Sequence, residues 1–118
     1  MSHSSHGLIA EPASTSTPLA AGATFTGGAV DVASFATVTI SIFADVASAP
    51  DGLSMESSQD GVNWDRQKKV DLLAGESQIH AFLVVSAYFR VVYTNGPTPQ
   101  GEFRLQSIVH ATKDRSLT

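Results

Sequence analysis

The chain contains no cysteine among its 118 residues, so disulfide bonds and thiolate metal sites are excluded. Charged residues make up only 15% of the chain and the formal net charge is −4, which disfavours a nucleic-acid-binding surface, since such surfaces are normally basic. No apolar run approaches the roughly 20 residues that a membrane-spanning helix needs. The first residues also lack the basic and then apolar segments of a signal peptide. We therefore expect a protein made and assembled in a cytosol, with neither nucleic acid nor membrane as a partner.

What the chain has is an ordinary hydrophobic fraction of 42%, enough for one domain with a real core. No window shows the 3.6-residue period of a helix, whereas short alternating segments recur with turn signals about every eight to twelve residues. This pattern predicts an all-β fold: an antiparallel, jelly-roll-like β-sandwich of about seven or eight strands. The predicted strands lie within residues 23–28, 29–32, 37–44, 53–58, 64–72, 79–84, 88–94 and 103–109.

One stretch carries the clearest turn signal. Apolar and polar residues alternate over residues 53–58, as in a strand with one buried face. Asp60-Gly61 follows, and such a pair favours a type I′ turn, because both central residues of that turn need positive φ. Trp64, the only tryptophan, comes just after it. We therefore predict that Asp60, Gly61 and Trp64 form a structural hairpin whose indole is buried in the core.

The two ends of the chain differ from the middle. Residues 1–20 are rich in Ser, Thr and Ala, and predict a flexible N-terminal arm in which Leu8 and Ile9 form a small apolar anchor. Such an arm is either a loose terminus or a segment that orders on a partner. The sandwich is expected over residues 21–111, with a short charged tail at 112–118. His3 and His6 could be read as a metal pair, but nothing in a flexible arm would orient them.

No constellation for nucleophilic, acid–base or phosphate chemistry rises above what a Ser-rich chain contains by chance. We therefore expect no catalytic residue, no enzyme activity, no cofactor and no bound metal. His80 is a lone histidine in a predicted strand, which is typical of a surface or interface position. Arg90 and Arg104 are expected on adjacent strands, either as a small cationic ladder or as two ordinary surface arginines. Four loop aspartates could offer oxygen ligands to calcium but lack the dense spacing of a calcium loop: Asp45, Asp51, Asp60 and Asp65.

Two resemblances follow from the motifs. The Ser-x-Asp-Gly-x-x-Trp segment ending at Trp64 looks like the hairpin of discoidin-like modules and, loosely, the Asp-box turn of sialidases. A longer resemblance, from about Phe25 to Val109, is to small β-sandwich proteins of tailed bacteriophages and prophages. Those proteins are virion-associated, and some are cement (decoration) proteins of the capsid. The segments that carry the longer resemblance are residues 23–27, 38–43, 51–53, 60–64, 88–96 and 103–106.

The resemblance implies a capsid cement protein that sits on the outer head surface of a virion assembled in the bacterial cytoplasm. Its partners would be the major capsid protein, which the arm would contact through Leu8 and Ile9, and other copies of itself. We expect a homotrimer, because the outer faces of the sheets are weakly charged, with apolar exceptions at Phe43, Val92 and Ile108. The alternative is a carbohydrate-binding or structural module of a tail or head fibre, with Trp64 or Tyr88 as an exposed stacking platform.

Overall fold

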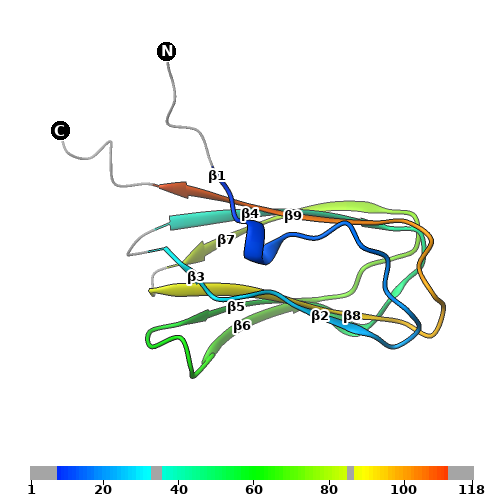
Figure 1. Ribbon diagram of the computed structural model, residues 1–118, viewed down its shortest axis with the longest axis horizontal. Helices are drawn as coiled ribbons and strands as arrows, with labels where there is room; N and C mark the ends of the chain where they lie inside the picture. Colours follow the sequence, from blue (N-terminus) through cyan, green and yellow to red (C-terminus); the bar gives the residue numbers. More distant parts are fainter. Residues whose placement is uncertain (1–7, 33–35, 85–86, 112–118) are drawn as a thin grey trace, which may run out of the picture.

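The computed structural model describes residues 8–32, 36–84 and 87–111. Two antiparallel sheets pack face to face, one above the other (Figure 1). The predicted all-β sandwich is therefore confirmed. The described elements are β1 (Leu8–Ile9), the 3-10 helix η1 (Glu11–Ala13), β2 (Thr24–Thr26), β3 (Val30–Asp31), β4 (Ala36–Ala44), β5 (Ser48–Ser58), β6 (Arg66–Val70), β7 (Ser77–Val84), β8 (Tyr88–Asn95) and β9 (Phe103–Ala111).

The upper layer in Figure 1, which we call the β4 sheet, has the strand order β1-β9-β4-β7. The lower layer, the β5 sheet, has the order β2-β8-β5-β6, and β3 also pairs with β8. Among the described strands, β6 and β7 each pair on one side only, so they form sheet edges. The strands expected at 37–44, 79–84, 88–94 and 103–109 are present within a few residues of their predicted bounds.

The core lies between the two sheets and follows the predicted alternation. Val38, Ile40 and Ile42 of β4 are 1% exposed or less and face Leu53 and Met55 of β5 across the sandwich, both fully buried. Aromatic rings of the core pack in tilted pairs. Their ring centres lie 4.8 Å apart for Tyr93 and Phe103 and 5.9 Å apart for Phe82 and Phe89.

The pairing of strand β7 with β4 determines which face of β7 is buried. Both of its faces are apolar, but the register with β4 places Phe82 opposite Val38, and both side chains point into the core. Ile79 and Leu83 then point outward and are 72% and 50% exposed. The alternation of apolar residues in β7 alone could not decide between these two arrangements.

The structure corrects the prediction of a flexible arm over residues 1–20. Residues 8–20 are part of the sandwich, and residues 1–7 lie outside the described residues. β1 pairs with β9, and Thr15 forms an isolated bridge with Leu105. Ala10 is 7% exposed and Ala13 is fully buried. Small alanines allow this segment to lie close against the core without bulky apolar side chains, which is why its composition resembles that of a disordered arm.

Hydrogen bonds fix the same segment to β9 and to the far end of the sandwich. Ser14 Oγ accepts a hydrogen bond from the Ser107 backbone N–H at 3.0 Å and donates to the Ala10 carbonyl at 2.8 Å. Asn95, 1% exposed, donates through Nδ2 to the carbonyls of residues 19, 20 and 98. Since buried backbone groups need partners, these bonds hold residues 10–20 in place.

The predicted hairpin is present, but its turn differs from the expected one. β5 and β6 pair antiparallel up to Ser57 opposite Arg66, which leaves a loop over residues 58–65 in place of a two-residue turn. Gly61 has a φ of 79°, whereas Asp60 does not have positive φ, so the type I′ prediction is wrong. The loop is built instead on side-chain hydrogen bonds, because both Ser58 Oγ and the Asp60 carboxylate accept bonds from backbone N–H groups.

Candidate interaction surfaces

The outer face of the β5 sheet carries a charged cluster. Glu56 on β5 lies opposite Arg90 on β8, and Arg90 Nε donates to Glu56 Oε1 at 2.7 Å. Ser54 Oγ donates to the other carboxylate oxygen at 2.7 Å. The Glu56 side chain is only 7% exposed, so these two donors replace the water that its carboxylate loses on burial.

Trp64 belongs to this cluster and not to the core, so the predicted burial of its indole is wrong. The Arg90 guanidinium lies over its ring, 4.4 Å from the ring centre, and the residue is half-buried. The loop of residues 58–65 is longer than a tight turn, which places Trp64 before the start of β6 and outside the sandwich. Tyr88, the other proposed platform residue, is half-buried beside Gly61 of the same loop.

Asp60 organises the β5–β6 loop. Its Oδ1 accepts hydrogen bonds from the backbone N–H groups of Asn63 and Val62, each at 2.8 Å. The Asn63 amide and the Ser58 hydroxyl donate to the same carboxylate, at 2.7 and 2.9 Å. These donors, with the backbone N–H groups of Asn63 and Val62 having the largest effect, hold the pKa of Asp60 well below its usual range. The carboxylate is therefore a structural acceptor of the loop.

Arg90 and Arg104 were expected on adjacent strands, either as a cationic ladder or as two ordinary surface arginines. They lie on different sheets, so no ladder forms. Arg90 is on β8 of the β5 sheet, whereas Arg104 is on β9 of the β4 sheet. Arg104 pairs with Glu102 and lies over the Phe43 ring, 4.6 Å from its centre. Both arginines thus combine an ion pair with an aromatic ring, once on each outer face.

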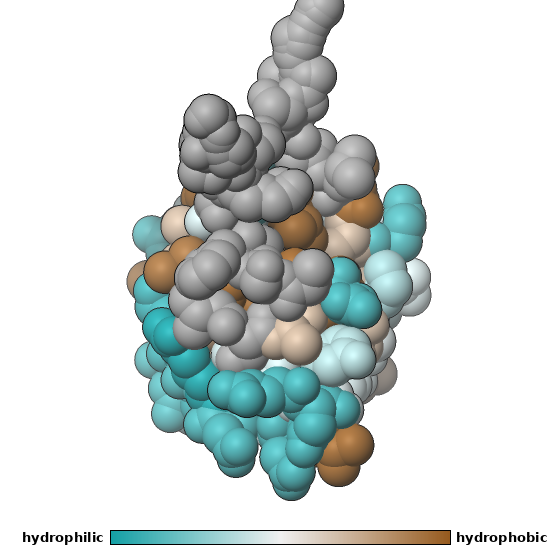
Figure 2. Space-filling model, turned by 90° about the vertical axis from the view of Figure 1, so that its left-hand side faces the viewer, coloured by the Kyte–Doolittle hydropathy of each residue, from teal (hydrophilic) through white to brown (hydrophobic). Residues whose placement is uncertain are grey.

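The outer face of the β4 sheet carries few charges and mixes apolar residues with Thr, Ser and Gln. Ile79 and Leu83 of β7 and Ile9 of β1, 51% exposed, point outward from it. Registers place Ile108 beside both Ile9 and Thr39, which extends this surface across the sheet. In the end-on view of Figure 2 the lower part is mostly hydrophilic, with a hydrophobic residue at its lower right, and further hydrophobic side chains are visible in the upper part.

The structure divides the residues predicted to mediate self-association. Phe43 and Ile108 lie on the outer face of the β4 sheet, on β4 and β9. Val92 lies on the outer face of the β5 sheet, opposite Ser54. These three residues therefore do not form one surface, and the sequence prediction missed the more exposed Ile79 and Leu83. The signal for those two was present in β7, which has apolar residues on both faces.

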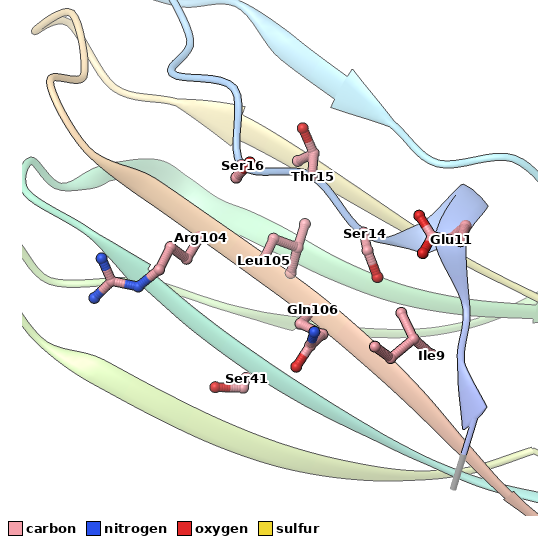
Figure 3. A pocket seen from close by; sticks show the side chains of 9 residues that line it. All are labelled: Ile9, Glu11, Ser14, Thr15, Ser16, Ser41, Arg104, Leu105 and Gln106. Atoms are coloured by element: carbon pink, nitrogen blue, oxygen red, sulfur yellow. The ribbon is translucent and has the colours of Figure 1, made fainter.

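A groove of about 490 Å³ lies beside the N-terminal segment, where it crosses β9 (Figure 3). Ile9, one of the two predicted capsid-contact residues, lies at one end of this groove. Leu8, the other predicted contact residue, belongs to strand β1. The groove combines apolar and hydrogen-bonding side chains, which suits a peptide or protein surface. Its lining residues are Ile9, Glu11, Ser14, Thr15, Ser16, Ser41, Arg104, Leu105 and Gln106.

Within the described ranges, no three His, Asp or Glu side chains come together as a metal-binding group. Asp45 is engaged by the Gly101 backbone N–H, at 3.0 Å from both carboxylate oxygens. His80 is half-buried on β7 and contacts Gln78 at 2.9 Å. Burial, and to a smaller extent the nearby Lys68, lower the pKa of His80.

His3 and His6 lie outside the described residues. No described helix is long and apolar enough to cross a membrane.

Comparison with known proteins agrees with this architecture. The family described as the N-terminal domain of the uncharacterised protein YqxG matches residues 4–110. The solved structure "Crystal structure of PBSX exported protein XepA" has a TM-score of 0.75 and 24% sequence identity to the chain. The match covers 90% of this chain and 37% of that one, so this chain spans about a third of the length of XepA. The likeness shows a common fold. No curated protein sequence matches the chain.

Proposed function

Since the chain belongs to the family of the YqxG N-terminal domain, and its fold is that of part of an exported protein of phage PBSX, we propose that it is a structural protein of a tailed bacteriophage or prophage particle. More specifically, it is a cement protein that binds the outer head surface. There it bridges neighbouring subunits of the major capsid protein.

The observation that carries this proposal is the outer face of the β4 sheet. Large apolar side chains that are at least half exposed on one sheet face are candidates for contacts with other proteins. Ile9, Ile79 and Leu83 are each at least half exposed, and all point from the same face. A protein whose role is to contact other proteins of a particle accounts for this surface.

The groove beside the N-terminal segment is the proposed contact with the major capsid protein. Ile9 offers an apolar contact at one end, and Glu11, Ser16 and Gln106 offer hydrogen-bonding groups along it (Figure 3). Each copy would make only a modest contact. Many copies on one head would act together, because subunits bridged at several points separate only when several contacts break.

The test uses expanded heads purified without this protein, to which purified chain is added back. We expect the chain to bind these heads and to raise the temperature at which they release packaged DNA. Ile9→Lys should weaken binding, mainly through faster dissociation. Val62→Lys is the matched control, because Val62 is also an exposed apolar residue, at 76%, but lies on the β5–β6 loop away from the groove. If the unaltered chain neither binds nor protects the heads, the cement proposal is wrong.

The second candidate is a module of a tail or head fibre that binds carbohydrate. The half-buried position of Trp64 outside the core favours it, since exposed aromatic rings can stack on sugars. Arg90 already covers one face of this ring, however, which leaves less of the indole for a ligand. A glycan array with the unaltered chain and Trp64→Ala separates the two functions. Binding that disappears in the variant would support the fibre module.

A further inference from the structure

We propose that a pocket beside the β5–β6 loop binds a single carboxylate group, carried by a small molecule or by a polypeptide. The pocket has a volume of about 330 Å³, near the lower end of the usual range for ligand sites, so it suits a small polar group. It shares no residue with the groove beside the N-terminal segment. Its lining residues are Ser57, Ser58, Gln59, Asp65 and Arg66.

Ser57 supplies a hydrogen-bonding group that the fold does not use. It follows Leu53 and Met55 on the inward face of β5 and is 1% exposed. Its hydroxyl has no hydrogen-bond partner in the part of the chain that the structure describes. A buried hydroxyl without a partner lowers the stability of a fold. A ligand oxygen in the pocket that accepts a hydrogen bond from Ser57 would remove this cost.

Arg66 supplies a positive charge at the same place. It lies directly opposite Ser57 in the pairing of β5 with β6, so both side chains leave the sheet on the same face. Its guanidinium lies over the Phe82 ring, 5.5 Å from the ring centre, and forms no ion pair with a described residue. Arg90 and Arg104, in contrast, each pair with a glutamate. The free N–H groups of a guanidinium match the two oxygens of a carboxylate.

The local charge favours a carboxylate over a phosphate. Lys68 lies two residues beyond Arg66 on the same face of β6, opposite Met55, and also forms no ion pair with a described residue. Asp65 is the only carboxylate among the lining residues. Two positive charges and one negative charge leave a single positive charge. A carboxylate neutralises that charge, whereas a phosphate carries up to two negative charges and exceeds it.

The other lining residues differ in what they can offer. Ser58 Oγ already donates to the Asp60 carboxylate and accepts from the backbone N–H groups of Asp60 and Gly61, so it is occupied by the loop. Gln59 is exposed and can donate through its side-chain amide. Because Ser57 is almost closed off from solvent, a ligand reaches its hydroxyl only when the exposed Arg66 side chain turns from the Phe82 ring toward the ligand. An exposed cation–π contact is weak enough to allow this movement.

NMR titration of the full chain tests this inference. The probes are sodium acetate, inorganic phosphate and the blocked peptide acetyl-Gly-Glu-Gly-amide, each compared with sodium chloride at equal ionic strength. We expect acetate and the peptide to shift the backbone amide signals of Ser57 and Arg66 to a saturating value, and phosphate to bind more weakly than acetate. Tighter binding of the peptide than of acetate identifies a polypeptide as the source of the carboxylate. Equal binding identifies a small molecule as sufficient.

Variants separate the site from a general effect of charge. Arg66→Gln should weaken acetate binding about tenfold or more, the usual effect of removing a charged hydrogen bond. Ser57→Ala should weaken it about fivefold without lowering the melting temperature, since the hydroxyl has no partner in the fold. Lys69→Gln is the matched control, because it makes the same charge change on β6 but lies opposite Ser54, on the outer face. It should bind acetate like the unaltered chain.

Three results would overturn the inference. The first is the lack of a saturating shift with both acetate and the peptide. The second is an equal loss of binding in Arg66→Gln and Lys69→Gln, which would indicate non-specific attraction. The third concerns Asp65→Asn, which should strengthen binding because it removes a like charge. Weaker binding by this variant would mean that Asp65 accepts a hydrogen bond from a hydroxyl-bearing ligand. Because no heads are present, these outcomes are independent of whether the protein binds capsids.

Discussion

The guanidinium carbon of Arg90 lies 4.4 Å from the centre of the Trp64 ring, while Nε of the same residue donates to Glu56. A single arginine thus neutralises a nearly buried carboxylate and covers the only tryptophan. The indole is held on the outside of the β5 sheet by this contact, and the core is closed by other aromatic rings, among them Tyr93 and Phe103.

Trp64→Ala should therefore cost about 1 kcal/mol of unfolding free energy, the usual size of a partly exposed cation–π contact. Phe103→Ala, which removes a ring that is 2% exposed, should cost about 3–5 kcal/mol. Urea unfolding followed by circular dichroism measures both. Equal losses for the two variants would mean that Trp64 is a core residue after all.

Arg90→Met should lower the unfolding free energy by about 3 kcal/mol, because it leaves the Glu56 carboxylate buried without its cation. Glu56→Gln together with Arg90→Met should cost clearly less than Arg90→Met alone, since no uncompensated charge remains. The double-mutant cycle is measured by the same urea unfolding. Strictly additive effects would show that the ion pair contributes nothing to stability.

Asp60 should titrate at lower pH than an ordinary aspartate, because the backbone N–H groups of Asn63 and Val62 stabilise its charged form. A lowered pKa in the folded state means that the contribution of this carboxylate to stability is present above about pH 4 and is lost as the pH falls further. Carboxyl carbon NMR measures the titration directly. Asp60→Asn should show a smaller loss of stability on acidification than the unaltered chain. A normal aspartate titration would contradict the loop geometry.

The strands were predictable wherever only one face is apolar. In β4 the alternation of Val38, Ile40 and Ile42 with Thr and Ser identifies both the strand and its buried face. In β7 the alternation identifies the strand but not the face, because Ile79 and Phe82 are both large and apolar. The choice depends on the register with β4, which is a long-range property that no local pattern contains.

The site residues were harder to predict for two reasons. Trp64 is outside the core because its loop is held by the Asp60 side chain, and a short turn motif does not specify the length of the loop around it. Residues 8–20 are ordered through backbone hydrogen bonds and through small residues such as Ala13, which is fully buried. The flexible arm was predicted from hydrophobicity and composition. Backbone hydrogen bonds and buried small residues change neither property much, so the order of this segment was missed.

A chain that begins at Pro18 should be clearly less stable than the full chain. It loses the buried Ala13 and leaves the β9 backbone N–H groups of Leu105 and Ser107 without the partners that Thr15 and Ser14 supply. We expect a melting temperature lower by several degrees, since about 1 kcal/mol shifts the melting temperature of a domain of this size by about 4–8 °C. A chain that begins at Gly7 keeps every described residue and is the control. Equal melting temperatures for the two truncated chains would show that residues 8–17 do not contribute to the fold.

The central claim, that this protein is a structural part of a phage particle, is tested most directly by labelling it on purified native particles. Immunogold electron microscopy with an antibody against the chain locates the label on the head, on the tail or nowhere. We predict label spread over the head surface, which is where a cement protein binds. Label confined to tails or fibres would contradict the cement function and support the fibre module. Particles that carry no label, although the cell lysate contains the protein, would contradict a structural role altogether.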